Sequence, residues 1–287
     1  MSAYSAPALD LSARHDLRWL ARLLADVRDA VPSTEPLLVG ALARDLLLHY
    51  AYGVAITRAT EDVDLALAIG DWDEFDSVRS ALLLTGRFAP YTGAIHKLRY
   101  REQCWIDLVP FGAVEGPDGT IAWPPAGEEV MRVVGFREAN ATAILVTLPE
   151  SQIVRVVSLP ILAILKVLAW KDRHAYAPRK DALDLALILR NYLNAGNTDR
   201  LYRDMAHLLT EHFDFEKTGA WLAGRDARNL IEQHSKAMIR AIANVVLPEI
   251  DLEGRLTLVA EMSASDPENA LQLLVAFHRG LTGMETP

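Results

Sequence analysis

Residues 62–69 read Asp62-Val63-Asp64-Leu65-Ala66-Leu67-Ala68-Ile69, so that large apolar residues alternate with aspartate or alanine. An alternation with a period of two residues is typical of a β-strand whose two faces differ. Asp62 and Asp64 are therefore expected to project from one face, and the large apolar side chains from the other. The two carboxylates either belong to a polar site on a sheet or face solvent on an edge strand.

A strand that turns directly into a helix is expected just before this stretch. Leu37-Leu38-Val39-Gly40 has the composition of a short buried strand, and residues 41–52 follow with helical character. A helix that begins at a glycine has free backbone N–H groups and the positive end of its dipole at the turn, where a phosphate can bind. The alternative is that Gly40 only permits a tight turn.

The segment after residue 69 predicts a helix and then several strands. Asp71 and Glu74 form a capping-box pattern before a helix over residues 72–84, and short strands are expected between residues 88 and 157. One of these strands, over residues 105–109, contains Asp107 between apolar neighbours. A lone carboxylate is costly there unless it is paired or bound to a metal, so Asp107 is a candidate third carboxylate. The alternative is that it pairs with Arg99 or Arg101.

The rest of the chain is predicted to be mainly helical. Apolar residues at helical spacing indicate a leading helix from about residue 9 to 31, and Pro160 begins a helical half with helices over residues 161–170 and 181–192. We therefore predict an α/β (α+β) fold, in which a core with a mixed sheet is followed by an α-helical C-terminal region. The expected domains are residues 1–158, and residues 159–287 as a helical domain that completes the active site.

Composition limits the possible functions. The chain has 287 residues, 51% of them hydrophobic, and a formal net charge of −9. This charge argues against a broad basic surface for nucleic acid, although residues 166–180 gather several lysines and arginines that could form a local basic site. Cys104 is the only cysteine and is expected to be a buried, inert strand residue. Without a signal-like N-terminus or a long apolar span, we expect a soluble cytoplasmic protein with no membrane segment.

Three motifs in this order resemble the nucleotidyltransferase core of the DNA polymerase β superfamily. They are Val39-Gly40-Ala41-Leu42-Ala43-Arg44-Asp45, Arg58-Ala59-Thr60-Glu61-Asp62-Val63-Asp64 and Ile106-Asp107-Leu108-Val109-Pro110-Phe111-Gly112. In that superfamily a Gly-Gly or Gly-Ser turn holds the triphosphate, an Asp-x-Asp pair binds metal ions and a later strand supplies a third acidic residue. Here Ala41 stands in place of the second glycine or serine of the turn. This change retains the backbone N–H that a phosphate needs.

A further block, Lys166-x-x-Ala169-x-x-x-Arg173 followed by Arg179-Lys180-Asp181-x-x-Asp184, is similar to a motif of AbiEii-type nucleotidyltransferases. Lys180 stands where arginine is more usual, so a bidentate phosphate contact becomes a point-charge contact. On spacing alone, Lys166 could instead extend its ammonium group to the surface. The resemblance covers roughly residues 37–189.

The resemblance implies an enzyme that moves an NMP from an NTP to an acceptor hydroxyl and releases pyrophosphate. The reaction uses Mg2+ or Mn2+, because carboxylates on adjacent strands can hold such ions while phosphate oxygens complete the coordination. The implied metal ligands are Asp62, Asp64 and Asp107. The implied catalytic residues are these three with Lys166 and Asp184, and the implied nucleotide-binding residues are Gly40, Ala41, Arg44, Thr60, Arg173, Lys180 and Asp181.

An AbiEii-type protein is further expected to be the toxin of a toxin–antitoxin or phage-defence system, with tRNA as a possible acceptor and an antitoxin protein as a possible partner. One alternative is a nucleotidyltransferase for a small molecule such as an aminoglycoside. Another is a non-catalytic module that binds nucleotide or a protein. His96, Lys97 and Arg99 are expected on a strand near the acidic residues, at the surface or in contact with substrate. Trp105 and Trp170 are expected in the core, the alternative being that they stack on bases.

Overall fold

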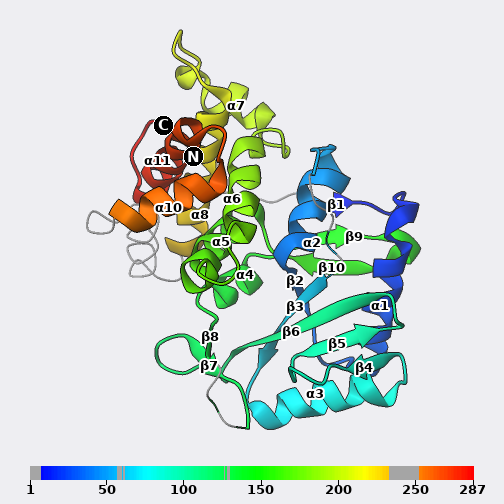
Figure 1. Cartoon of the computed structure of the whole chain (residues 1–287). Coiled ribbons are helices and arrows are strands. Elements are labelled where there is room, and N and C mark those ends of the chain that lie inside the picture. The colour runs from blue at the N-terminus through cyan, green and yellow to red at the C-terminus, as the bar shows by residue number, and fades with distance from the viewer. Residues whose placement is uncertain (1–7, 57–59, 61, 126, 128–129, 233–251) are drawn as a thin grey trace. The chain divides into compact units, whose positions relative to one another are not determined.

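The computed structural model describes residues 8–56, 60, 62–125, 127, 130–232 and 252–287, which form two compact units (Figure 1). The sheet unit consists of the described residues within 6–46 and 56–158, and the helical unit of those within 47–55 and 159–287. The predicted α/β fold, with a mixed sheet followed by helices, is confirmed. The division into domains 1–158 and 159–287 stays a prediction. Residues 47–55 offer a way to test it, because they precede residue 158 in sequence but belong to the helical unit.

An eight-stranded mixed sheet forms the sheet unit, and Figure 1 shows it from β1 and β9 at one edge to β4 at the other. Three strand pairs are parallel, namely β1–β9, β10–β2 and β3–β6, and the others are antiparallel. In sheet order the strands are β1 (Leu9–Asp10), β9 (Ile144–Thr147), β10 (Ile153–Val156), β2 (Leu37–Val39), β3 (Asp62–Ile69), β6 (Cys104–Gly112), β5 (Lys97–Tyr100) and β4 (Phe88–Pro90). A separate hairpin pairs β7 (Thr120–Ala122) with β8 (Val130–Arg132).

The central strand β3 has the two faces that its sequence predicts. Val63, Leu65, Leu67 and Ile69 are at most 2% exposed, whereas Asp62 and Asp64 on the opposite face are half-buried. The helices of the sheet unit are α1 (Arg18–Ala30), α2 (Gly40–Asp45), α3 (Trp72–Leu84) and α4 (Phe136–Ala141), with short 3-10 turns at His15–Leu17 and Pro149–Ser151. Helix α3 contacts both β3 and α1. The apolar stripe of α1, including Leu20, Leu23 and Leu24, is buried in this unit.

Helix α3 begins where its capping box predicts. The Asp71 side chain accepts a hydrogen bond from the Glu74 N–H at 2.8 Å, and the Glu74 carboxylate accepts one from the Gly70 N–H at 2.7 Å. Two N–H groups near the helix start are thereby satisfied by side chains. The predicted bounds of this helix, residues 72–84, are confirmed.

The expected leading helix is wrong in its first part. Leu9 and Asp10 form the edge strand β1, which pairs in parallel with Val146 and Thr147, and α1 begins only at Arg18. Backbone hydrogen bonds with β9 at the sheet edge determine the conformation of residues 9–10. The apolar residues at helical spacing begin at Leu17, which is fully buried.

Helices make up the helical unit. They are the π-helical segment Leu46–Tyr50, part of which lies in this unit, followed by α5 (Leu159–Arg173), α6 (Lys180–Asn191), α7 (Thr198–Asp204), a 3-10 turn at Ala206–Leu208, α8 (Phe215–Glu232), α10 (Leu252–Met262) and α11 (Pro267–Thr282). Helices α8 and α11 pack backbone to backbone at two glycines. A Cβ atom on Gly224 would overlap the carbonyl oxygen of Phe277, and one on Gly280 would overlap that of Trp221. Within the described residues, no helix is long and apolar enough to cross a membrane.

Candidate active site

The three predicted carboxylates lie on two neighbouring strands of the sheet unit. Strands β3 and β6 run parallel, with Asp64 opposite Asp107 and Asp62 opposite Trp105. Opposed residues of a strand pair project from the same face, and neighbouring strands are about 4.8 Å apart. Asp62, Asp64 and Asp107 therefore share one face of the sheet, and all three are half-buried.

The glycine turn lies directly against one of these carboxylates. Gly40 is the first residue of α2, has a φ of +72°, and follows Val39, which is opposite Asp64 in the β2–β3 pair. A Cβ atom at Gly40 would overlap the Asp64 carboxylate. Only glycine satisfies both the left-handed backbone and this close approach. The turn and the Asp-x-Asp motif are thus parts of one local structure.

The third carboxylate has an incompletely satisfied environment. The Oδ1 atom of Asp107 is buried and accepts no hydrogen bond from the described residues. The Nζ atom of Lys97, opposite Asp107 in the β5–β6 pair, lies 3.7 Å from it. The expected alternative partners are engaged elsewhere, since Arg99 binds Glu102 and Arg101 binds Asp26, each at 2.9 Å. The side chain beside Asp107 is therefore Lys97.

The carboxylate oxygens on this face provide some of the ligands that a hard divalent cation needs. Carboxylate oxygens are the ligands that Mg2+ prefers, and the buried Oδ1 of Asp107 accepts no hydrogen bond from the described residues, so a cation could bind there. Among the residues that the structure describes, however, no three histidine, cysteine or acidic side chains converge closely enough to hold a metal by themselves. Mg2+ commonly binds through one or two carboxylates with water and phosphate oxygens, so the two strands fit a site that substrate completes.

The remaining predicted residues of this unit have different surroundings. The Thr60 hydroxyl contacts the backbone of Asp62, accepting from its N–H at 3.3 Å. Arg44 is 6% exposed and donates from Nε to the adjacent Asp45 carboxylate at 2.8 Å. Ala41 is buried at 7% exposure. Thr60 thus supports the start of β3, and the charge of Arg44 is balanced inside α2.

Cys104 is buried at the start of β6, as predicted. Burial and the nearby negative charge of Asp62 raise the pKa of its thiol to about 11. A thiol with a raised pKa is protonated near neutral pH and is a poor nucleophile. The prediction that Cys104 is inert agrees with these surroundings.

Four residues of the block over residues 166–184 form a buried ion network in the helical unit. Lys166 of α5 contacts Asp181 and Asp184 of α6, with N–O distances of 3.1 and 2.5 Å. Arg173 binds the Asp181 carboxylate with two donors, at 2.5 and 2.7 Å. Lys166 is 4% exposed, so the alternative in which its ammonium group reaches the surface is wrong. Two positive and two negative charges balance each other within the network.

The electrostatics of this network centre on Asp181, which is 1% exposed. Burial alone would raise the pKa of its carboxyl group, but the hydrogen bonds from Arg173 and the positive charges of Lys166 and Arg173 outweigh burial and lower that pKa. Asp181 is therefore ionised at neutral pH, which a buried carboxylate tolerates only with such partners. The network joins α5 to α6.

The start of α6 is held by Glu261, a residue that belongs to no recognisable sequence motif. The Oε2 atom of Glu261, in α10, accepts hydrogen bonds from the Arg179 backbone N–H at 3.0 Å and the Trp170 indole at 2.8 Å. Arg179 has a φ of +66°, an uncommon conformation for a residue with a side chain. Lys180, which follows, is half-buried, and its side chain makes no hydrogen bond or ion pair with the described residues. No local pattern links residue 261 to residue 179.

The structure thus gathers the predicted site residues into two groups, each within its own unit. Gly40, Asp62, Asp64 and Asp107 lie together on the sheet unit, and Lys166, Arg173, Asp181 and Asp184 lie together on the helical unit. The first group combines carboxylates with a glycine turn, the residue types that the predicted metal and triphosphate sites require. The second is a buried network of two cations and two carboxylates, and Lys180, next to it in sequence, has no side-chain partner among the residues that the structure describes.

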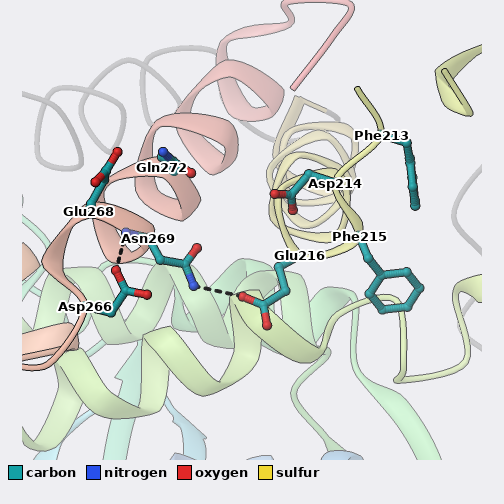
Figure 2. A pocket seen from close by; sticks show the side chains of 8 residues that line it. All are labelled: Phe213, Asp214, Phe215, Glu216, Asp266, Glu268, Asn269 and Gln272. Atoms are coloured by element: carbon teal, nitrogen blue, oxygen red, sulfur yellow. Dashed lines mark hydrogen bonds between the residues drawn. The ribbon is translucent and has the colours of Figure 1, made fainter. Parts of the chain in front are cut away.

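An open cavity of about 650 Å³ lies elsewhere in the helical unit (Figure 2). Its lining comes from the start of α8 and the start of α11, and four of the eight residues are acidic. Asn269 connects the two helices, donating to the Glu216 carboxylate at 3.0 Å. The lining residues are Phe213, Asp214, Phe215, Glu216, Asp266, Glu268, Asn269 and Gln272. None of the predicted site residues lines this cavity.

Comparison with known proteins identifies one family. Residues 22–272 match the family described as "Nucleotidyl transferase AbiEii toxin, Type IV TA system". Among solved structures, the chain is similar to the antibiotic-resistance factor ANT(2'')-Ia, with 13% sequence identity and a TM-score of 0.35 over 66% of this chain and 96% of that chain. No curated protein matches the sequence.

Proposed function

The chain belongs to the AbiEii family of nucleotidyl transferase toxins of type IV toxin–antitoxin systems and is a nucleotidyltransferase, and we propose that it moves an NMP from an NTP to an acceptor hydroxyl and releases pyrophosphate. The observation that carries the proposal is the arrangement of Gly40, Asp64 and Asp107. The glycine turn is packed on the Asp64 carboxylate, and Asp107 is opposite Asp64 on the next parallel strand.

Asp62, Asp64 and Asp107 would hold the divalent cation, Mg2+ or Mn2+. This assignment is supported by their common sheet face, their partial burial and the buried Asp107 oxygen that accepts no hydrogen bond from the described residues. A bound cation would neutralise charge on the triphosphate and make the acceptor hydroxyl more acidic. The protein's own contribution is to hold the carboxylates on two rigid strands, which limits their movement during the reaction.

The glycine turn is assigned to the triphosphate. The N–H groups in the first turn of a helix have no partners inside the helix, so those of Gly40 and Ala41 are available to phosphate oxygens. Because Gly40 has no side chain, the backbone comes close to Asp64, which would place phosphate and cation next to each other. Thr60 positions Asp62 through its backbone, and Arg44 stabilises α2 through Asp45.

Asp107 is assigned as the base that takes the proton of the acceptor hydroxyl. The hydroxyl oxygen bonds to the α-phosphorus as the bond from that phosphorus to the bridging oxygen breaks, and pyrophosphate leaves with the electron pair. A base must lie within hydrogen-bonding distance of the proton that it accepts. The Asp107 carboxylate has two oxygens, so one would be left to accept the proton when the other binds the cation.

Residues of the helical unit are assigned to phosphate and to positioning. Arg173 is partly exposed, with 34% of its side-chain surface accessible. Lys180 is half-buried and has no partner among the described residues. We therefore assign these two side chains to contacts with phosphate oxygens. Lys166 is buried between Asp181 and Asp184 and is better suited to fixing α5 against α6. We therefore propose Lys166, Asp181 and Asp184 as positioning residues.

The family membership supports a toxin with an antitoxin protein as partner. We further propose that the acceptor is a nucleic acid such as tRNA and that the protein acts in the cytoplasm. The alternative of a small cationic acceptor such as an aminoglycoside is disfavoured by local charge. Lys97 and Arg99 lie on β5, beside the strand that carries Asp107. They would repel a polycation and attract a polyanion.

The test is incubation of the purified protein with each α-labelled NTP, Mg2+ or Mn2+, and total tRNA. Wild type is expected to move label onto RNA, and the Asp62→Ala, Asp64→Ala double variant is expected to lose transfer by at least a hundredfold, since charge stabilisation of this kind is worth several kcal/mol. Its fold should be retained, because removing two neighbouring carboxylates also removes their mutual repulsion. Circular dichroism checks the fold.

The matched control is Asp73→Ala, Asp76→Ala, which removes two exposed carboxylates of α3 in the same unit. This variant should transfer label like the wild type. Transfer that survives in the Asp62, Asp64 variant would remove the proposed metal site. Metal-dependent NTP binding without label on RNA would redirect the acceptor to a protein or a small molecule.

A further inference from the structure

A large aromatic side chain lies next to the carboxylate site without being buried in the core. Trp105 is opposite Asp62 in the β3–β6 pair, two residues from Asp107 on the same face of β6, and it is half-buried. The expectation that it belongs to the core is therefore only partly met. A tryptophan that retains exposed ring surface beside an acidic site offers a flat apolar surface to a ligand.

Cations and a second aromatic ring surround this tryptophan. Lys97 Nζ lies 5.5 Å and the Arg99 guanidinium carbon 5.4 Å from the centre of the Trp105 ring. The ring of Tyr91, which is 43% exposed, meets Trp105 edge-on at 5.4 Å. Arg99 also pairs with Glu102, but at 74% exposure of the Glu102 side chain such a pair contributes little stability. Lys97 also faces Asp107.

The position of this cluster in the sheet indicates which of the two substrates it would contact. In the order β2-β3-β6-β5, the glycine turn lies on the β2 side of the carboxylates, and Lys97, Arg99 and Trp105 lie on the β6–β5 side. The attacking and leaving oxygens of a phosphoryl transfer lie roughly in line on opposite sides of the phosphorus. If the triphosphate binds at the glycine turn, the attacking group approaches from the β5 side.

We propose that Tyr91, Lys97, Arg99 and Trp105 form a subsite for a single-stranded nucleic acid, which presents the acceptor hydroxyl; this deepens the proposed function and rests on it. A base stacks on Trp105 against the edge of Tyr91, and backbone phosphates contact Lys97 and Arg99. Aromatic stacking combined with neighbouring cations is the general means by which proteins bind single strands without reading their sequence. A duplex does not fit this description, because its bases are stacked on each other.

Charge supports the choice of a polyanion. The chain carries a net charge of −9, so most of its surface repels nucleic acid. Two cations gathered around the half-buried Trp105 ring, beside the carboxylates, are a local exception.

The test measures binding directly, without NTP and in the presence of EDTA, so that it does not depend on transfer activity. The probe is a fluorescein-labelled oligouridine of about 12 nucleotides, within the usual site sizes of single-strand binders, and its affinity is measured by fluorescence anisotropy. Trp105→Ala is expected to weaken binding about tenfold, as loss of one stacked base does. Trp105→Phe, which retains a stacking surface, should bind within about threefold of wild type.

The cations are tested by salt dependence. Lys97→Gln, Arg99→Gln should lower the slope of log affinity against log salt by about 1.4, since each phosphate contact to a single strand contributes about 0.7. The matched control is Tyr202→Ala, Arg203→Gln, an exposed aromatic and an exposed cation on α7. This control should leave both the affinity and the slope unchanged. If Trp105→Ala fails to fold, Tyr91→Ala and the cation variants carry the test.

Several outcomes would overturn the assignment. These are unchanged oligouridine affinity in Trp105→Ala, equal binding of a duplex of the same length, or a loss confined to NTP affinity, which would make the ring a contact for the base of the NTP. The Asp62→Ala, Asp64→Ala variant should bind oligouridine at least as tightly as the wild type in EDTA, because it removes two negative charges beside the subsite. A failure of the proposed transfer reaction is therefore separable from a failure of the subsite.

Discussion

Residue 40 must be glycine for two reasons, its backbone conformation and the lack of space for a side chain. Its φ of +72° alone disfavours a side chain, and the Asp64 carboxylate fills the space where a Cβ atom would lie. Gly40→Ala should therefore lower the free energy of unfolding by more than the cost of about 1 to 2 kcal/mol for the left-handed backbone. It should also abolish detectable NTP transfer, because Asp64 or the turn must move. Chemical denaturation and the labelled-NTP assay measure the two effects.

Gly86 provides the matched control for this substitution. It has nearly the same φ, +70°, lies in the same unit, and a Cβ atom there would meet nothing within 4 Å. Gly86→Ala should show the backbone cost alone and retain transfer. Equal losses of activity in the two variants would mean that the contact between Gly40 and Asp64 has no special part in the site.

How far single residues could be predicted from the sequence depended on the range of their interactions. Asp62 and Asp64 could be placed on one face because the period of a strand is local information. Lys97 could not be identified as the neighbour of Asp107, because their proximity comes from the antiparallel register of β5 and β6. Glu261 carried no signal at all, since it meets Arg179 across 82 residues of chain.

Elements with strong local signals were predicted closely. Strand β3 was predicted by its alternation, and α3 by a capping box that the structure contains. Strand β1 cannot be predicted from the sequence, because two residues are too few to show a period and the partner strand β9 lies far along the chain. The segment Leu46–Tyr50 continues the expected helix after α2 but widens to a π-helix, for which the sequence gives no recognised signal.

The pair of helices α5 and α6 makes a prediction about Lys166. Removing its charge leaves Asp184 and Asp181 buried, with Arg173 as the remaining cation of the network. Lys166→Met should therefore lower the free energy of unfolding by about 3 to 5 kcal/mol, the usual effect of breaking a buried ion pair from one side. Denaturant titration at neutral pH measures the change. Any loss of transfer in this variant must first be corrected for unfolded protein.

Lys180→Met is the matched control on the same helix. Lys180 is half-buried and has no described partner, so its removal should change the free energy of unfolding by no more than about 0.5 kcal/mol. If Lys180 contacts phosphate, the variant should need several-fold more NTP for half-maximal transfer. Wild-type stability in Lys166→Met would contradict the positioning role and return Lys166 to direct contact with substrate.

On the scale of the whole molecule, the chain order and the compact units do not coincide. Residues 47–55 precede most of the sheet in sequence but belong to the helical unit. Leu47 and Leu48 are 2% and 0% exposed, and the Tyr52 hydroxyl fills the space beside Gly196, which has a φ of +80°. A cut at residue 158 would therefore separate the helical unit from a segment that contributes to its core.

This arrangement predicts the behaviour of the chain when it is expressed as two pieces, residues 1–158 and residues 159–287. The pieces should purify together when co-expressed, because residues 47–55 of the first supply buried leucines to the unit formed by the second. Each leucine that is fully buried contributes about 1.5 to 3 kcal/mol. Leu47→Asp, Leu48→Asp in the first piece should therefore abolish co-purification on an affinity tag. Leu84→Asp, Leu145→Asp, at positions 87% and 50% exposed, should not. Independent folding of the second piece, with the same thermal stability whether or not the first is present, would contradict the contribution of residues 47–55 and would favour a simple boundary at residue 158.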